Sequence, residues 1–502
     1  EKQAFTDEDM RILTNGRITS KNDAFVDGVK VIERDITCKN GYIHKVDGVI
    51  EGYVNMAEIL RQHPNMSQWS RLIDRFSAPY YDKKKTEAYN RLYNQNVDSV
   101  FTLRYFASKR GDGLAATSYP ITKGNPVETK VDATLAFDPG WNQYMYENTS
   151  GYDLHYDAGA MLVPTNEALD RWWNADGKVL KDMYKNWDNV PDKVLSKLLN
   201  VNMLGTFTDA IPSKFSSIVN DAKVSMGVTK EAVDSCFIGC NGVVYMVNRV
   251  FSPMEYSSVA FPALVHEDIM NVIYWAIDEL EFTPYLNSMD SYYSLLLPTN
   301  SALMLYVDPC SYGDNQMTML EFYYDTKEKK VKAHRYACNI TDDGQIEKGM
   351  MVVKDVPSQQ VENRLRDLMN QMIIVGNVEN GYDYYKSKNG TMIKVNNAGQ
   401  KNLMTVSGGF QLEHNTPIKV DSIYDLSETG NGKSYSMSNQ VPLPASQSVY
   451  QTLQKHPEYS EFLKLLITSK KVDDKDIILS NSMKLNGVTY NCLSKNTNSN
   501  IN

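Results

Sequence analysis

Two short apolar runs along the chain end in the same way, with proline followed by threonine and asparagine. Residues 160–164 and 294–298 are mostly apolar, which is typical of a strand buried on both faces. Proline ends each run because it lacks a backbone donor, and the Thr-Asn pair supplies a side-chain oxygen that caps a following helix. The pattern therefore predicts a buried strand and then a helix at 160–169 and again at 294–303.

Three further segments alternate apolar and polar residues on both sides of an Asn-Gly pair. Asn-Gly favours a tight hairpin turn, because glycine adopts positive φ without steric cost. The pairs predict strand–turn–strand units around positions 40, 241 and 431, of which the third is the least regular. The segments are residues 38–50, 239–251 and 430–442.

A third repeated pattern surrounds a His-Pro dipeptide. Residues 56–69 match residues 449–462, and residues 269–286 resemble a degenerate third copy. Each copy predicts a helix that ends near the proline and a second helix capped by serine. His63 and His456 occupy equivalent positions, which favours a structural role at the end of the first helix.

Two more elements follow from the spacing of apolar residues between 318 and 372. Residues 318–324 and 330–339 alternate in the manner of a hairpin, with a charged turn at 325–330. Residues 361–372 have apolar side chains at helical spacing and charges on the other face, which predicts an amphipathic helix. Its expected buried positions are Val361, Leu365, Leu368, Met369 and Met372.

The repeated segments together resemble the signature boxes of fasciclin (FAS1) modules, and they recur in the order that the family shows. The resemblance covers most of the chain and implies an α+β fold of tandem FAS1 modules. Each module is expected to be a β-rich wedge with packed helices, and to carry a large insertion. The resemblance implies the first box at residues 162–169 and 295–303, and the second box at residues 40–50, 241–251 and 431–443.

The spacing of the Asn-Gly turns predicts the module boundaries. The turns lie 201 and 190 residues apart, and a lone FAS1 module is shorter, so each complete copy should contain an insertion. The outer segments hold only part of the pattern, and we expect the natural protein to be longer at both ends. The predicted segments are 1–52, the C-terminal part of a module; 53–253, a module with an insertion at about 76–153; 254–445, a module with an insertion at about 308–361 and a further one at 377–412; and 446–502, the start of another module.

Composition and charge exclude several classes of protein. Hydrophobic residues make up 42% and charged residues 23% of the 502 residues, which is typical of a globular chain. The net charge is −9 and there is no long basic run, so nucleic acid is not expected as a partner. No apolar stretch reaches the roughly 20 residues of a membrane helix, and no secretory leader is visible after Glu1.

The sequence contains no recognisable catalytic or metal-binding motif. The six cysteines are too few for a disulfide scaffold, and the C-x3-C pair at 236–240 has no second Cys or His pair nearby. Carboxylate pairs such as Asp170/Asp176 are typical of solvated helix faces, and Asp342-Asp343-Gly344 is typical of a turn rather than a calcium loop. We therefore expect no enzyme, cofactor or metal, and a hydrolase is the remaining enzymatic alternative.

Aromatic residues provide the candidate binding site. The chain has 32 Tyr, 15 Phe and 6 Trp, and the densest group lies in the first predicted insertion. Aromatic faces suit protein partners and sugar rings, whereas the alternative is that these rings pack the insertion onto its module. The predicted ligand-binding residues are Phe137, Trp141, Tyr144 and Tyr146. Further tyrosines are Tyr80, Tyr81, Tyr89, Tyr93 and Tyr105 in the same insertion, and Tyr382, Tyr384 and Tyr385 in the next module.

The FAS1 resemblance implies a non-enzymatic protein that holds partners at a cell surface. Chains with large, Asn- and Tyr-rich FAS1 modules resemble bacterial outer-membrane lipoproteins. This predicts an exported protein that associates with a nutrient-uptake complex of the SusC/SusD kind or serves adhesion. Its lipid anchor would lie ahead of Glu1, since none of the six cysteines is terminal. The alternative is a module that binds a glycan or a peptide directly through the cluster near Trp141.

Overall fold

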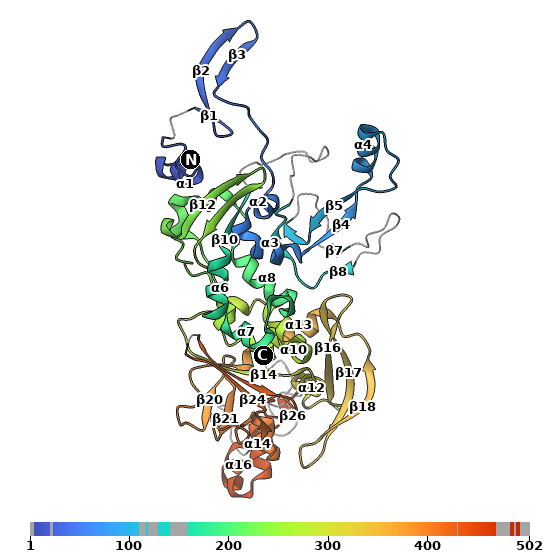
Figure 1. The fold of residues 1–502 in the computed structure, drawn as a ribbon. Coiled ribbons are helices and arrows are strands. Elements are labelled where there is room, and N and C mark those ends of the chain that lie inside the picture. Colours follow the sequence, from blue (N-terminus) through green and yellow to red (C-terminus); the bar gives the residue numbers. More distant parts are fainter. Residues whose placement is uncertain are drawn as a thin grey trace. The chain divides into compact units, whose positions relative to one another are not determined.

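The chain forms two compact units, residues 1–256 and 257–502 (Figure 1). Each unit is built on a four-stranded sheet with the same strand order. The finer division into four segments, with its boundaries at 52/53, 253/254 and 445/446, stays a prediction. The computed structural model describes residues 5–20, 24–109, 117–118, 129–140, 158–428, 430–467, 482–485 and 488–491.

The sheet of the first unit contains both predicted boxes as neighbouring strands. The order is β11-β10-β13-β12, and β10 runs parallel to β13 from Gly159 opposite Gly242 to Pro164 opposite Val247. The other two pairings are antiparallel, and β12 and β13 form the predicted hairpin. The strands are β10 (Gly159–Pro164), β11 (Met203–Leu204), β12 (Val233–Gly239) and β13 (Gly242–Val247).

The sheet of the second unit repeats this topology. The order is β19-β14-β25-β24, and β14 runs parallel to β25 from Tyr293 opposite Gly432 to Pro298 opposite Met437. Both parallel pairs therefore start at the glycine of an Asn-Gly turn and end at the proline of an apolar run. The strands are β14 (Tyr293–Pro298), β19 (Ile373–Val375), β24 (Ser422–Leu426) and β25 (Gly432–Met437). The predicted α+β fold of tandem modules is confirmed.

In the second and third Asn-Gly pairs, the asparagine ties the sheet to the start of a helix pair. Asn241 Oδ1 accepts the Met56 N–H at 2.9 Å, and Asn431 Oδ1 accepts the Val259 N–H at 2.9 Å. Asn431 also donates to the carbonyls of Leu286 and Ser288. These bonds join segments that are about 140–185 residues apart in the sequence.

The predicted helix pairs around His-Pro are present. The first is α2 (Met56–Gln62) followed by α3 (Ser67–Asp74), and the second is α15 (Val449–Lys455) followed by α16 (Ser460–Ile467). His63 and His456 are the C-caps of α2 and α15, which confirms their place at the helix end.

The serine cap predicted for the second helix is wrong in α3. The N-cap of α3 is Met66, which makes no side-chain cap bond, and Ser67 is the first helical residue. The orphan Gln68 N–H instead donates to Asn166 Oδ1 at 3.0 Å, so the cap comes from the first box. In the second unit, Asn300 accepts the Val272 N–H at 3.2 Å in the same way.

The predicted third copy of this helix pair, residues 269–286, begins ten residues too late. The bond from the Val259 N–H to Asn431 matches the bond from the Met56 N–H to Asn241, so the copy starts at Val259. Glu267 occupies the position of the proline in the other two copies, so the His-Pro dipeptide by which the helix pair is identified in the sequence is missing here. The copy comprises α9 (Phe261–Val265) and α10 (Glu267–Glu279), which is kinked at Met270.

The first insertion is a hairpin with a helix in its connection, followed by short strands. β4 and β5 pair from Ser77 opposite Tyr105 to Tyr81 opposite Phe101, and α4 lies between them in the sequence. The elements are β4 (Ser77–Tyr81), α4 (Lys83–Tyr93), β5 (Phe101–Tyr105), β6 (Ala107–Lys109), β7 (Thr117–Ser118), β8 (Thr129–Lys130) and β9 (Leu135–Phe137). The helices α6 (Asn166–Asn174), α7 (Lys178–Tyr184) and α8 (Asp192–Val201) follow β10.

The second insertion confirms the predicted hairpin and helix. β16 and β17 pair up to Asp325 opposite Lys330, and α13 buries all five predicted apolar positions. The sheet order is β15-β16-β17-β18, and a second small sheet has the order β20-β21-β22-β23. The elements are α11 (Thr283–Leu286), α12 (Asn300–Leu303), β15 (Tyr306–Val307), β16 (Thr318–Asp325), β17 (Lys330–Ile340), β18 (Ile346–Val353), α13 (Ser358–Met372), β20 (Tyr384–Lys386), β21 (Met392–Asn396), β22 (Thr405–Ser407), α14 (Gly409–His414) and β23 (Ile418–Lys419).

The N-terminal segment contains a helix and the hairpin predicted around Asn40. Helix α1 packs on the first unit, where Leu13 joins the apolar core and Asn15 bonds both backbone groups of Cys236 at 2.7 Å. The elements of this segment are α1 (Asp7–Leu13), β1 (Phe25–Val26), β2 (Val29–Cys38) and β3 (Gly41–Val46). The last two strands of the chain are β26 (Ser482–Leu485) and β27 (Val488–Asn491). Among the helices of the described ranges, none has both the length and the apolar character that crossing a membrane requires.

Candidate interaction surface

The predicted ligand-binding cluster is only partly within the described residues. Phe137 is 6% exposed, and its ring packs so closely on Gly159 that an added Cβ there would lie 2.8 Å from it. Phe137 therefore helps to fix the insertion to the sheet. Trp141, Tyr144 and Tyr146 lie outside the described residues, so this cluster stays a prediction as a ligand site.

Tyr105 anchors the first insertion to the helix pair. It is 1% exposed, and its hydroxyl donates to Asp74 Oδ1 and accepts from Arg61 Nη2, both at 2.6 Å. Burial, reinforced by the Asp74 carboxylate, raises the pKa of Tyr105 well above its ordinary value. Its role is packing, as the alternative reading of the aromatic cluster expects.

Helix α4 is hydrogen-bonded to the segment that connects it to β5 and to the start of β5. Asp82 caps the helix by accepting the Lys85 N–H at 2.9 Å, and its other oxygen accepts from Thr102. Thr86 Oγ1 accepts the Val100 N–H at 2.9 Å. The Asn90 side chain both accepts from and donates to the backbone of Val97 at 2.9 Å. These bonds at both ends fix the direction in which α4 presents its outer face.

The outer face of α4 exposes three large apolar side chains, which we call the α4 surface. Tyr89 is 40%, Leu92 75% and Tyr93 59% exposed, and the two tyrosine rings lie 4.8 Å apart. Residues three and four apart share one helix face, so the three side chains form one patch. Tyrosine is enriched in protein interfaces and among the residues that contribute most to their binding energy.

The charged residues of α4 are mostly positive. The helix carries Lys83, Lys84, Lys85 and Arg91 against Glu87 alone, although the chain as a whole is acidic. A helix N-terminus favours anions, so three lysines in the first turn do not stabilise α4.

Replacing the exposed tyrosines should leave stability nearly unchanged. We expect the double substitution Tyr89→Ala, Tyr93→Ala to alter the free energy of unfolding by less than about 0.5 kcal/mol, as surface changes do. Tyr105→Phe should instead cost about 1–2 kcal/mol, because Asp74 and Arg61 lose a buried partner. Urea denaturation of the three proteins checks this, and a larger loss in the double variant would mean that the α4 surface is part of the fold.

The tyrosines of the second unit also include a buried residue that packs within the fold and others that are exposed. Tyr385 is buried and its hydroxyl donates to Asn380 Oδ1 at 2.6 Å, while Tyr382 and Tyr384 are exposed. Tyr384 has the Lys394 ammonium 5.8 Å from its ring centroid. No helix comparable to α4 carries these side chains in the described part of this unit, so the stronger candidate surface is in the first insertion.

Within the described residues, no group of three or more His, Cys, Asp or Glu side chains could hold a metal ion. Asp170 accepts hydrogen bonds from Gln68, and the Asp342-Asp343-Gly344 segment is a turn closed by a Gly344 N–H to Thr341 bond of 2.9 Å. Neither arrangement assembles reacting groups.

The described cysteines should differ sharply in their reactivity. Cys38, Cys236, Cys240, Cys310 and Cys338 are all free thiols. Burial raises the pKa of Cys338 to about 11 and raises that of Cys236 further, so both stay protonated and shielded at neutral pH.

We expect a thiol reagent to modify exposed Cys38 and Cys310 quickly, and Cys236 and Cys338 only after unfolding. Because the native pKa of Cys338 is raised, its contribution to stability is complete below the ordinary thiol pKa of about 8.5 and is lost as pH rises toward about 11. Peptide mapping by mass spectrometry checks the order, and rapid labelling of Cys338 in the folded chain would contradict it.

Comparison with solved structures finds similarity to a FAS1 domain pair from the insect cell adhesion molecule fasciclin I. The match is 13% identical, covers 57% of this chain and 89% of that chain, and has a TM-score of 0.22. No family model matches the chain, and no curated protein matches it. Support for tandem modules comes from the repeated sheet order within this chain and not from that match.

Proposed function

We propose that this chain is a non-enzymatic interaction protein of the cell surface, and that the α4 surface is where it contacts a protein partner. The finer part of the proposal is that it is an outer-membrane lipoprotein associated with a nutrient-uptake complex of the SusC/SusD kind. The resemblance of its boxes to FAS1 modules supports the first part, and its large Asn- and Tyr-rich insertions suggest the second.

The observation that carries the proposal is the exposure of Tyr89, Leu92 and Tyr93 on a helix fixed at both ends. Exposing apolar side chains on a rigid element gains nothing for folding, whereas it lowers the entropy cost of binding. The lysines of the first turn suggest that the partner presents acidic residues around an apolar centre.

The proposal is tested by isolating the protein from its source membranes in mild detergent. The wild-type protein should co-purify with a partner in fixed stoichiometry. The triple variant Tyr89→Ala, Leu92→Ala, Tyr93→Ala should co-purify with at least about tenfold less of that partner. Met350→Ala, which removes an exposed apolar side chain from the second unit, is the matched control and should behave as wild type.

The identity of the partner separates the two parts of the proposal. An outer-membrane transporter supports both parts, and another surface protein supports only the first. Equal recovery of the partner with the triple variant would contradict the role of the α4 surface, and isolation of the chain alone would contradict both parts.

A further inference from the structure

In both units, a helix pair contacts the hairpin of the second box (β12–β13 or β24–β25) in the same two ways. The first is the 2.9 Å bond from the start of the helix pair to the asparagine of the Asn-Gly pair. In the second, the histidine that ends the first helix packs on the edge strand of the hairpin. The ring centroids of His63 and Phe237 lie 4.0 Å apart, and those of His266 and Tyr424 lie 5.4 Å apart. Phe237 and Tyr424 hold equivalent positions, since each lies two residues before the residue that pairs with the hairpin glycine.

The β2–β3 hairpin has the same register, but its equivalent side chains are exposed. Asn40 is equivalent to Asn241, and Ile36 is equivalent to Phe237. The Asn40 side chain makes no hydrogen bond to any residue that the structure describes. Ile36 is 37% and Tyr42 67% exposed. β3 ends the three-stranded sheet β1-β2-β3, so among the described residues its outer edge has no neighbouring strand.

Gly41 lies at a position where the equivalent glycine has close neighbours. A Cβ at Gly242 would lie 2.9 Å from the Met56 side chain at the start of α2, and 2.2 Å from the carbonyl oxygen of Gly159. A Cβ at Gly41 would meet nothing within 4 Å, and the φ of Gly41 is not positive. The hairpin by itself therefore does not require glycine here. Glycine inside a strand often marks the close approach of another segment, so Gly41 points to a segment that packs on this hairpin.

The α15–α16 helix pair is exposed where the equivalent pair α2–α3 is buried. In the His-Pro repeat, Val449 is equivalent to Met56 and Phe462 is equivalent to Trp69. Met56 and Trp69 are fully buried, whereas Val449 is 77% and Phe462 56% exposed. The Val449 N–H, at the first position of α15, has no acceptor within its helix and donates to no described residue. This helix pair therefore carries the donor and the apolar side chains by which α2–α3 contacts its hairpin.

We infer that α15–α16 of one copy of the chain packs on the β2–β3 hairpin of a second copy. Asn40 Oδ1 accepts the Val449 N–H, and His456 packs on Ile36, as the equivalent groups do within each unit. The hairpin provides an acceptor and exposed apolar side chains, and the helix pair provides a donor and an exposed apolar face. Burial of apolar area from both sides drives this association.

The contact is head-to-tail, because it joins two different surfaces of the chain. A bound pair of copies keeps one free hairpin and one free helix pair, so further copies add until a ring closes. The α4 surface belongs to neither half of the contact. Self-association is therefore separate from the proposed contact with a protein partner.

The inference is tested on the full 502-residue chain by sedimentation velocity. The average sedimentation coefficient of the wild-type protein should rise beyond the dimer value between about 1 and 200 µM, the range in which contacts of micromolar affinity form. A hairpin variant (Asn40→Ala, Gly41→Val) and a helix variant (Phe462→Asp, Leu465→Asp) should each associate at least about tenfold more weakly. All four positions are exposed, so both variants should unfold in urea as the wild type does.

A mixture of the two variants tests the head-to-tail geometry. The helix variant keeps its hairpin and the hairpin variant keeps its helix pair, so the mixture should form dimers and nothing larger. Met350→Asp is the matched control for the helix variant, because it places the same charge at another exposed apolar position of the second unit. It should associate as the wild type does.

Three results would overturn the inference. They are a wild-type chain that stays monomeric at every concentration, association that is unchanged in both variants, and a mixture that stays monomeric although the wild type associates. The first would favour an occupant other than a second copy, and the third would mean that two like surfaces pair. Because neither variant alters α4, these results leave the proposed partner contact untouched, and failure of that contact leaves self-association untouched.

Discussion

Replacing Gly432 by alanine is expected to destabilise the second unit by about 3–5 kcal/mol, the largest effect of any single change considered. Gly432 has a φ of +149° and lies at the start of the parallel pairing between β14 and β25. A Cβ at this position would lie 1.9 Å from the carbonyl oxygen of Tyr293, which is part of the backbone of the neighbouring strand. The clash can be relieved only by separating the two central strands.

A control in the same unit separates the clash from the φ strain. Gly376 has a φ of +122°, but a Cβ there would meet nothing within 4 Å, so Gly376→Ala should cost only about 1–2 kcal/mol. Urea denaturation gives both values, and hydrogen exchange should show loss of protection in β14 and β25 for Gly432→Ala alone. Equal costs for the two variants would show that the close strand approach is unimportant.

Removing the Asn431 side chain is expected to cost about 3 kcal/mol. Asn431 is buried, and Asn431→Ala leaves the Val259 N–H and the carbonyls of Leu286 and Ser288 without their partner. Unpaired buried backbone groups are costly because they have lost their contact with water without replacing it. Thermal or urea unfolding of the full chain measures the loss.

Two further variants test this explanation of Asn431. Asn241→Ala in the first unit should cost less, about 2 kcal/mol, because Asn241 is less buried and its side chain bonds Met56 and Pro139, one partner fewer than Asn431 has among the described residues. Asn363→Ala, on the exposed face of α13, should change stability by less than about 0.5 kcal/mol. A loss below about 1 kcal/mol for Asn431→Ala would contradict the view that these asparagines tie each sheet to the start of a helix pair.

Elements with a local physical cause could be predicted from the sequence. The buried strands at 160–164 and 294–298 follow from apolar runs ended by proline. The Asn-Gly pairs located the hairpins correctly, but Gly242 and Gly432 are the first residues of β13 and β25 and do not lie in the turns themselves. The five apolar positions of α13 are all buried because helical spacing places them on one face. In each case the residues that determine the element lie within it.

Features that depend on distant partners could not be predicted. The parallel pairing of β10 with β13 joins residues about 80 positions apart, and no local pattern marks it. The cap of α3 comes from Asn166, about 100 positions away, so a rule that looks for a neighbouring serine chose Ser67 wrongly. The third helix pair was misplaced because Glu267 replaces the proline on which the match relied.

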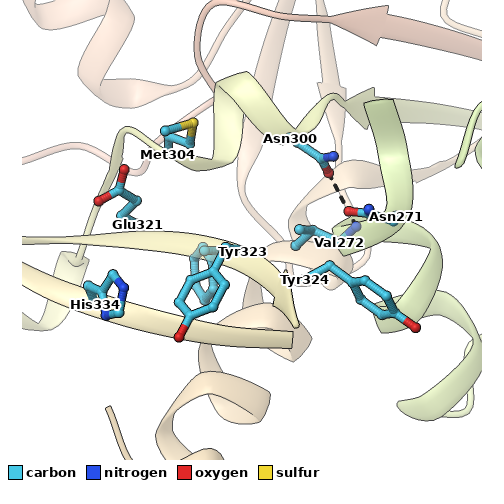
Figure 2. Close-up of a pocket in the computed structure, with 9 residues that line it drawn as sticks. Asn271, Val272, Asn300, Met304, Glu321, Tyr323, Tyr324 and His334 are labelled. Atoms are coloured by element: carbon cyan, nitrogen blue, oxygen red, sulfur yellow. Dashed lines mark hydrogen bonds between the residues drawn. The ribbon is translucent and has the colours of Figure 1, made fainter. Parts of the chain in front are cut away.

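The candidate surfaces show the same limit. Tyr89 and Tyr93 are conspicuous in the sequence, but Leu92 joins them only once residues 83–93 are known to be helical and exposed. A pocket in the second unit is lined by Asn271, Tyr323 and His334, among others, which come from a helix and two strands (Figure 2). The sequence shows where the aromatic residues are, but packing across the whole unit determines which side chains are exposed and which lie close together.

Site-specific photo-cross-linking shows directly whether the α4 surface contacts a protein partner. A photoreactive phenylalanine analogue in place of Leu92, in cells of the source organism, should yield one discrete cross-linked protein. The same analogue in place of exposed Tyr382 serves as the control and should not yield that product. Adding Tyr89→Ala and Tyr93→Ala to the Leu92 probe should remove the product. A probe at position 92 that gives no cross-linked protein, or the same products as the probe at position 382, would contradict a partner contact at the α4 surface.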